Sequence, residues 1–401
     1  MTSATLTEQP ATMSTPHCRR LFADFFLLGA TAFGGPAIIA QMRRLSVVQR
    51  HWMSASEFDE GIALSQALPG ATAMQCAAYA GLRLRGFRGA LASFVGLGLP
   101  AFLLMLAASV GYPHAAGLLT AQATLRGLRV AVVAIVAWSA LGFARTQTRT
   151  SADLIFVGLS TLLLLLGCHP VLVVGVTAVA GLLRSGQREA VPVLPPAAPI
   201  GGHLVKWVGL LMLAATCGVG VLLLTAPSLA LLGLAMMKID MVAFGGGFAA
   251  LPLMQDEFVT SSAAVAASTF MDGIAFGQVT PGPIVVTATF IGYQIHGLPG
   301  AIVATAGIFF PSFTLVVAVG PWFERLQRNP RFRSATKAAS LAFVGLLVSV
   351  TLRLARSLPW TTGHVLLALA ALAGLRVGIK TYWIVFACGL LATLMQRFGV
   401  F

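Results

Sequence analysis

Long apolar stretches follow one another along almost the whole chain, and short polar or basic loops separate them. A helix of about 20 apolar residues spans a bilayer, so this pattern predicts helices that cross or enter a membrane. In the first half of the chain the apolar segments are 21–42, 58–80, 87–111, 125–145, 152–167 and 169–184. In the second half they are 229–253, 270–292, 298–321, 336–355, 362–376 and 379–398, with one additional segment, 205–225, between the two sets. Several are short, and we expect the pairs at 152–184 and 362–398 to form helical hairpins.

The two halves carry the same motifs. Phe33-Gly34-Gly35-Pro36 returns about 211 residues later as Phe244-Gly245-Gly246-Gly247. Gln66-Ala67-Leu68-Pro69-Gly70 returns as Gln278-Val279-Thr280-Pro281-Gly282, which Pro283 follows. Gly and Pro interruptions at matching places in two apolar halves are the best sequence indication of a transporter's binding site.

The charges of the loops predict how the halves are oriented. The loops on either side of segment 58–80 carry six arginines, Arg43, Arg44, Arg50, Arg83, Arg85 and Arg88. The matching loops of the second half carry no Lys or Arg and hold Asp256 and Glu257 instead. The next loop reverses this bias, because 112–125 has no Lys or Arg whereas 324–337 has Arg325, Arg328, Arg331, Arg333 and Lys337. Since positive loops face the cytoplasm, the two halves are expected to be inverted, with segment 205–225 supplying the odd crossing.

The same charges predict that segment 58–80 does not cross the membrane. With both flanks cytoplasmic, it would enter, turn near Pro69-Gly70 and leave on the same side, and segment 270–292 would do so from outside. We therefore expect an all-α polytopic membrane protein of two inverted-topology repeats with broken or re-entrant helices and about 10–13 membrane segments. The predicted parts are a cytoplasmic tail (1–20), a first repeat (21–184), a linker with one transmembrane helix (185–228) and a second repeat (229–401).

Composition supports this class and excludes others. With 57% hydrophobic residues, 9% charged residues and a mean hydropathy of +0.88, the chain is not a water-soluble globule. The net charge of +14 comes mostly from loops beside apolar segments, where basic residues meet lipid headgroups, so no nucleic-acid partner is predicted. The five cysteines form no Cys-x-x-Cys pair, and no metal or other cofactor is expected. The sequence has no His-Glu-x-x-His, Gly-x-Ser-x-Gly or Walker A motif, which argues against an enzyme.

Helices that begin inside the membrane point unpaired N–H groups and a positive dipole end at whatever lies ahead, so they suit an anion. The expected substrate-binding residues are the glycines and prolines of these starts and turns, with two glutamines and a threonine as neutral hydrogen-bonding groups: Gly34, Gly35, Pro36, Gln66, Pro69, Gly70, Gly245, Gly246, Gly247, Gln278, Thr280, Pro281, Gly282 and Pro283. Thr72 and Thr287 are further donors nearby. The alternative is that the glycines and prolines are kinks and packing points, and that the glutamines join helices.

Four ionisable residues in or beside apolar segments are candidates for charge or proton coupling, namely Glu60, Lys238, Asp240 and Asp272. Lys238 is either a counter-ion for the substrate or the partner of Asp240 near the membrane edge. Glu60 and Asp272 occupy equivalent positions and are either proton carriers or helix-capping carboxylates near the interface.

Together, Phe33-Gly34-Gly35-Pro36, Leu68-Pro69-Gly70, Phe244-Gly245-Gly246-Gly247 and Gln278-Val279-Thr280-Pro281-Gly282-Pro283 resemble the chromate ion transporter (CHR) family in its long, two-repeat form. The resemblance implies a multi-pass protein of the bacterial inner (plasma) membrane that exports chromate and confers chromate resistance. One departure is Leu68-Pro69-Gly70-Ala71, where the family commonly has a second Pro-Gly-Pro-type turn. The expected partners are chromate or a sulfate-like anion and the lipid bilayer, and a homodimer is a candidate assembly. A sulfate or other oxyanion carrier or channel, and a membrane anion sensor or scaffold, remain alternatives.

Overall fold

The computed structural model describes residues 16–116, 119–183, 204–323 and 329–397, so most of the predicted tail and residues 185–203 of the predicted linker lie outside the described residues. Within the described ranges the secondary structure is helical, apart from an isolated bridge between Phe33 and Gly282. Five described helices are long and apolar enough to cross a membrane, and several shorter helices are also apolar. The predicted polytopic, all-α class is confirmed.

The helices of the two halves correspond in order. Those of the first half are α1 (Cys18–Thr31), α2 (Gly35–Arg43), α3 (Ala55–Ala67), α4 (Thr72–Ala116), α5 (Leu119–Gln147), α6 (Ser151–Leu165) and α7 (Pro170–Leu183). Their counterparts are α9 (Pro227–Val242), α10 (Gly247–Gln255), α11 (Ala267–Val279), α12 (Thr287–Val319), α14 (Pro330–Arg356), α15 (Thr362–Val377) and α16 (Thr381–Arg397). The π-helical turns η1 (Arg44–Gln49) and η2 (Asp256–Ser261) continue α2 and α10, and the 3₁₀ turn η3 (Ile284–Val286) precedes α12.

The first apolar segment of each half is broken in the middle, as the glycine motifs predict. α1 ends at Thr31 and α2 begins at Gly35, while α9 ends at Val242 and α10 begins at Gly247. The N-cap residues Gly34 and Gly246 have φ of +79° and +89°, a conformation that glycine adopts without steric cost. The proline in the first turn of α2 lacks an N–H that the helix would leave unpaired.

The predicted re-entrant segments are helical hairpins. Gly61 in α3 packs against Tyr79 in α4, and Glu60 faces Arg83, so the beginning of α4 runs back along α3 after the Pro69–Gly70 turn. In the second half, Gly273 packs against Phe290 in the same way. Each segment therefore returns toward the end from which it started, as a re-entrant segment must.

A second reversal follows each hairpin, at Arg85–Gly86 in α4 and at His296–Gly297 in α12. There Gly86 and Gly297 have φ of +62° and +60°. Beyond the reversal the Ser93 hydroxyl donates to the Ala77 carbonyl at 2.7 Å, so α4 consists of two antiparallel helices in close contact. The chain of each half thus runs back on itself twice.

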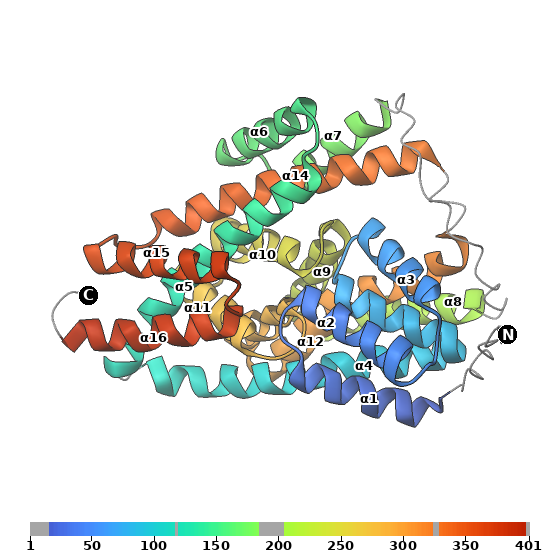
Figure 1. Ribbon diagram of the computed structural model, residues 1–401. Coiled ribbons are helices and arrows are strands. Elements are labelled where there is room, and N and C mark those ends of the chain that lie inside the picture. The colour runs from blue at the N-terminus through green and yellow to red at the C-terminus, as the bar shows by residue number, and fades with distance from the viewer. Residues whose placement is uncertain (1–15, 117–118, 184–203, 324–328, 398–401) are drawn as a thin grey trace, which may run out of the picture.

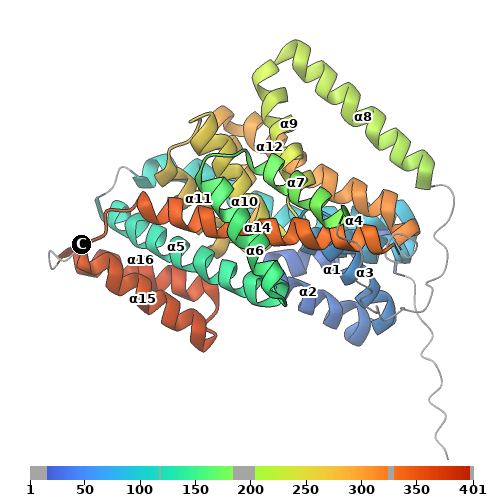
Figure 2. The same ribbon diagram turned by 90° about the horizontal axis from the view of Figure 1, so that it is seen from above.

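The ends of the two halves are exchanged. The hairpin α6–α7 packs on α14 of the second half, and the hairpin α15–α16 packs on α5 of the first half (Figure 1). Both predicted hairpins are confirmed, but their exchange was not predicted. Helix α8 (Leu204–Thr225) lies outside this arrangement, packs mainly on α9 and projects from the bundle in Figure 2.

Candidate functional site

The helix breaks of one half are hydrogen-bonded to the re-entrant turns of the other. The Gly282 N–H donates to the Ala32 carbonyl at 2.8 Å, and the Gly70 N–H donates to the Ala243 carbonyl at 2.9 Å. These two bonds are equivalent under the internal repeat. They join, in two pairs, four chain interruptions that are far apart in the sequence, and each interruption is followed by the start of a helix.

The start of α10 contacts two of the other helix starts. A Cβ atom on Gly246 would lie 2.9 Å from the Thr72 hydroxyl oxygen in the first residue of α4. A Cβ on Gly247 would lie 2.8 Å from the side chain of Val285, in the turn that precedes α12. Glycine is therefore required for this close approach, and the first N–H groups of α10 have no carbonyl partners within their own helix.

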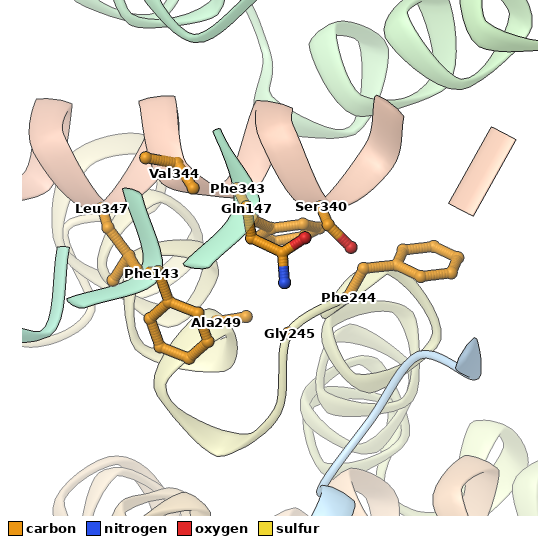
Figure 3. Close-up of a pocket in the computed structure, with 9 residues that line it drawn as sticks. All are labelled: Phe143, Gln147, Phe244, Gly245, Ala249, Ser340, Phe343, Val344 and Leu347. Carbon is orange, nitrogen blue, oxygen red and sulfur yellow. The ribbon is translucent and has the colours of Figure 1, made fainter. Parts of the chain in front are cut away.

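A small pocket adjoins this start. It is lined by Phe143, Gln147, Phe244, Gly245, Ala249, Ser340, Phe343, Val344 and Leu347, from both halves of the chain. Figure 3 shows the Gln147 amide and the Ser340 hydroxyl pointing toward the backbone of Phe244 and Gly245. The arrangement offers neutral hydrogen-bond donors within an apolar lining beside the start of α10, which is chemistry suited to an anion.

Sequence reasoning did not identify Gln147 or Ser340. Gln147 is the last residue of α5, just beyond the apolar segment 125–145, and Ser340 lies within segment 336–355. Neither position belongs to a repeated motif, and only the packing of α5 and α14 beside α10 brings them to Gly245. The sequence feature that could have identified these two residues is a polar side chain within or beside an apolar segment.

The two predicted glutamine donors occupy different environments. Gln66 is exposed on α3, whereas Gln278 in α11 is 8% exposed and its Nε2 has no hydrogen-bond partner. Gln278 therefore has a donor available inside the protein. The Thr287 hydroxyl is less available to a ligand, because it donates to the Ile284 carbonyl at 2.9 Å.

The remaining predicted positions form the breaks and turns themselves. Gly34 is exposed, with open space where a Cβ would be, and Gly35 and Pro36 form the first turn of α2. Pro69 accepts a hydrogen bond from Gln75 at 2.6 Å through its carbonyl. Residues 280–283 connect α11 to the turn before α12 and lie beside Ala32 and Phe33.

Asp272 is the centre of a buried ion pair between the halves. Both of its carboxylate oxygens accept hydrogen bonds from Arg129 of α5 at 2.8 Å, and one also accepts from the Tyr112 hydroxyl at 2.8 Å. Its side chain is 0% exposed. Asp272 is the sixth residue of α11, so the alternative of a helix-capping carboxylate is wrong for this position. Arg129 was missed, although a charge within an apolar segment was visible in the sequence.

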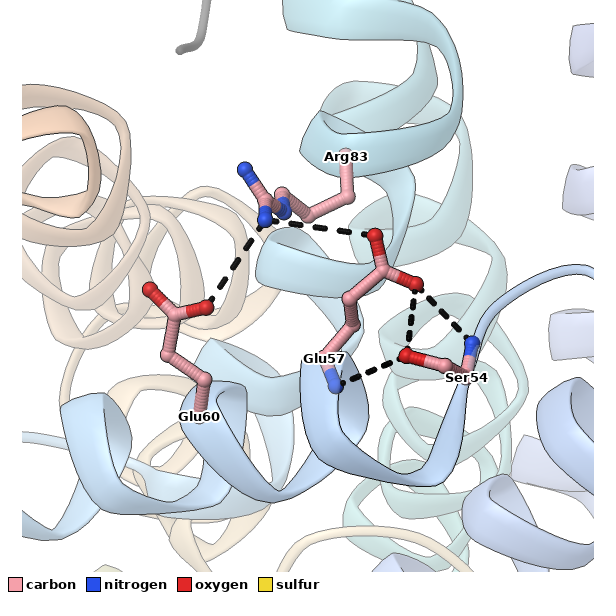
Figure 4. Close-up of polar contacts among 4 residues, drawn as sticks. All are labelled: Ser54, Glu57, Glu60 and Arg83. Atoms are coloured by element: carbon pink, nitrogen blue, oxygen red, sulfur yellow. Dashed lines mark hydrogen bonds and ion pairs between the residues drawn. The ribbon is translucent and has the colours of Figure 1, made fainter. Parts of the chain in front are cut away.

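Glu60 occupies the equivalent position but has a different partner. It faces Arg83 at 3.7 Å, within the same hairpin (Figure 4). The capping role belongs to Glu57, which exchanges hydrogen bonds with Ser54 at the start of α3. The capping interpretation of Glu60 is therefore also wrong, and the two carboxylates of the repeat differ in surroundings.

Of the two alternatives for Lys238, the pairing with Asp240 is wrong. Lys238 donates to Glu257 of η2 at 2.5 Å, whereas Asp240 is buried and accepts hydrogen bonds from Ser312 of α12. The reason is helix geometry, because residues two apart on a helix point in nearly opposite directions. Lys238 lies on an accessible face and Asp240 on the face that packs against α12.

Comparisons with known proteins agree with the internal repeat. The family model described as "Chromate transporter" matches the chain twice, over residues 19–182 and 230–393. The chain is 38% identical to an uncharacterized transporter of Methanocaldococcus jannaschii over 87% of each chain. It is 30% identical to the chromate transport protein of Cupriavidus metallidurans over 90% of this chain and 88% of the relative. A probable chromate transport protein of Synechococcus elongatus is 31% identical over 84% of each chain. No solved structure matches the chain.

Proposed function

Because the chain belongs to the chromate transporter family, we propose that it exports chromate across the bacterial inner membrane and confers resistance to chromate. The observation that carries this proposal is the start of α10, where Gly245 to Gly247 lie beside Thr72 and Gln147. Chromate is a tetrahedral dianion with four acceptor oxygens, and a helix N-terminus with neutral donors binds such a group without a fixed cation. A site without a fixed positive charge also releases its anion readily.

In this proposal Gln278 supplies a further donor. Its amide nitrogen is buried without a partner, on α11, and α11 leads into the turn that bonds to the α1–α2 break. The two re-entrant hairpins, inserted from opposite sides, would move relative to the exchanged hairpins and expose the site to each side in turn. Alternating access of this kind is the usual behaviour of inverted repeats built on broken helices.

The inverted topology has its own test. Cysteines introduced one at a time at 55 and 85, in a variant without the native cysteines, should react with an impermeant reagent from the cytoplasmic side. Cysteines at 260 and 296 should react from outside. Reaction of 55 and 85 from opposite faces would contradict both the re-entrant arrangement and the inversion.

The transport assay uses energised inside-out membrane vesicles and radiolabelled chromate, with and without excess sulfate. We expect energy-dependent accumulation that Gly245→Leu abolishes, since φ at Gly245 is +109° and the residue lines the pocket. The matched control is Gly209→Leu on exposed α8, where a Cβ would have no neighbour within 4 Å. Accumulation of sulfate instead of chromate would show that sulfate is the substrate. If purified, reconstituted protein moves neither anion, the alternative of a membrane anion sensor is favoured.

A further inference from the structure

Asp240 is a buried carboxylate beside the α9–α10 break, and its partners join it to both halves. It is 0% exposed and lies three residues before Ala243, whose carbonyl holds the Gly70 turn. One carboxylate oxygen, Oδ2, accepts from the Ser312 N–H at 2.8 Å and from the Ser312 hydroxyl at 2.7 Å. The same hydroxyl accepts from the Ala71 N–H at 2.8 Å. Asp240 is thus connected to the re-entrant turn through one serine.

The second oxygen of Asp240 has no hydrogen-bond partner, and neither has the side-chain oxygen of Gln75. Gln75 is also 0% exposed, and its amide nitrogen donates to the Pro69 carbonyl. Both side chains meet at the same turn, because a Cβ on Gly70 would lie 3.0 Å from Asp240 Oδ2 and 3.0 Å from Gln75 Nε2. Two buried acceptors without donors are costly, and a proton on Oδ1 of Asp240 turns one of these acceptors into a donor.

The internal repeat shows that the fold does not need this polar cluster. The positions equivalent to Asp240 and Ser312, 211 residues earlier, are Gly29 and Ala101. The turn equivalent to Gly70 is at Gly282, where a Cβ would lie 2.5 Å from the Ala101 Cβ and 3.7 Å from the Gly29 carbonyl oxygen. One half therefore closes the same turn on a methyl group and a backbone carbonyl, whereas the other places a carboxylate there. Buried ionisable groups in membrane proteins are functional by default.

The described groups that face Asp240 are neutral. They are Ser312 from α12 and Ala71 and Gln75 from the turn and the beginning of α4. Of the other elements packed on α9, α10 has no ionisable residue, and the only lysine of α8, Lys206, is exposed. Lys238, on α9 itself, pairs with Glu257. No counter-ion in the described part of the chain compensates a charge on Asp240, whereas a bound proton removes that charge.

We propose that Asp240, together with Gln75, binds the proton whose entry into the cell drives the anion outward. This inference rests on the proposed transport function. Asp240 and the anion pocket lie on the two sides of one break, since Ala243 holds the Gly70 turn and Gly245 lines the pocket. Binding or release of a proton at Asp240 changes the hydrogen bonding of that turn and hence the shape of the break. The proton is taken up from one side and released to the other, without further chemistry.

The test uses purified protein in liposomes with the membrane potential clamped. Exchange of radiolabelled chromate for internal chromate, without a pH gradient, reports anion passage alone. Accumulation driven by an acidic lumen, one pH unit below the outside, reports coupling. One proton per anion converts that gradient into about a tenfold higher accumulation, since about 1.4 kcal/mol corresponds to a factor of ten. A pH-sensitive dye should also show proton efflux when chromate is added outside.

We expect Asp240→Asn to retain exchange but to lose the tenfold accumulation and the proton flux. Gln75→Leu should reduce both coupled readouts, whereas the matched control Asp59→Asn, at an exposed position, should behave like the wild type. Undiminished accumulation in Asp240→Asn would overturn the assignment, and so would loss of exchange in a well-folded variant, because the residue would then serve anion passage itself. If accumulation by the wild type follows a Na⁺ gradient at equal pH, the bound ion is not a proton. Absence of exchange in the wild type would instead refute the proposed function.

Discussion

Removing Arg129 should destabilise the protein more than removing its partner Asp272. The two form a pair between the halves, with both carboxylate oxygens bonded at 2.8 Å. In Arg129→Leu the carboxylate, 0% exposed, stays buried with only the Tyr112 hydroxyl as donor, and uncompensated buried charges cost about 3–5 kcal/mol. In Asp272→Asn the unpaired guanidinium is less buried, with 23% of its side chain exposed, so we expect the lower end of this range, about 3 kcal/mol. Tyr112→Phe removes one hydrogen bond and should cost about 1 kcal/mol.

The assay is equilibrium unfolding in mixed micelles, followed by the loss of helical signal. The double variant Arg129→Leu/Asp272→Asn should cost at least about 2 kcal/mol less than the sum of the single variants, because neither charge is then left alone. The control is Arg43→Leu, which breaks the exposed Arg43–Asp59 pair at 3.2 Å and should change stability by less than about 1 kcal/mol. Additive costs, or single costs as small as that of the control, would refute the buried-pair reasoning.

Gly282→Ala should lower the free energy of unfolding by about 3 kcal/mol, because φ is +106° and the new methyl group would meet Ala101. Gly34→Ala, at φ +79° with open space around it, should lower it by about 1 kcal/mol in the same assay. Equal losses of stability in the two variants would show that the contact with Ala101 does not limit the size of the residue at position 282. Gln278→Ala should reduce chromate transport more than Gln278→Asn, which retains an amide; equally mild losses in vesicle uptake would assign Gln278 to packing. Ser54→Ala should lower stability by about 1 kcal/mol through loss of the capping box, while leaving the transport rate per folded molecule unchanged.

The helix breaks were predictable from the sequence because their signal is local. Gly and Pro mark where a helix must stop or start, and the positions predicted at Gly35 and at Pro69–Gly70 coincide with observed ends of helices. The internal repeat gives each such position an equivalent in the other half, which strengthens the prediction. The hairpins 152–184 and 362–398 were also predictable, because their apolar runs are short and adjacent in the chain.

The partners of these elements were not predictable in the same way. Nothing local to Gly282 indicates that its N–H bonds to Ala32, and nothing in α11 indicates Arg129 as the partner of Asp272. Such contacts depend on how distant helices pack, and a repeat does not reveal whether its halves pack separately or exchange parts. The alternative that Lys238 pairs with Asp240 fails for a simpler reason, since residues two apart on a helix are close in sequence but point in different directions.

The exchange of hairpins sets the order in which the protein can be assembled during synthesis. Helix α5 ends at Gln147, yet α15 and α16, which pack on it, are synthesised only after the second half has been made as far as α14. Contacts of such large sequence separation form late, because a long loop must close before they contribute to stability. A chain that has not yet reached α15 therefore carries a partly uncovered α5 in the membrane, where chaperones and proteases can recognise it. The first half completes its packing only after α15 and α16 have been inserted.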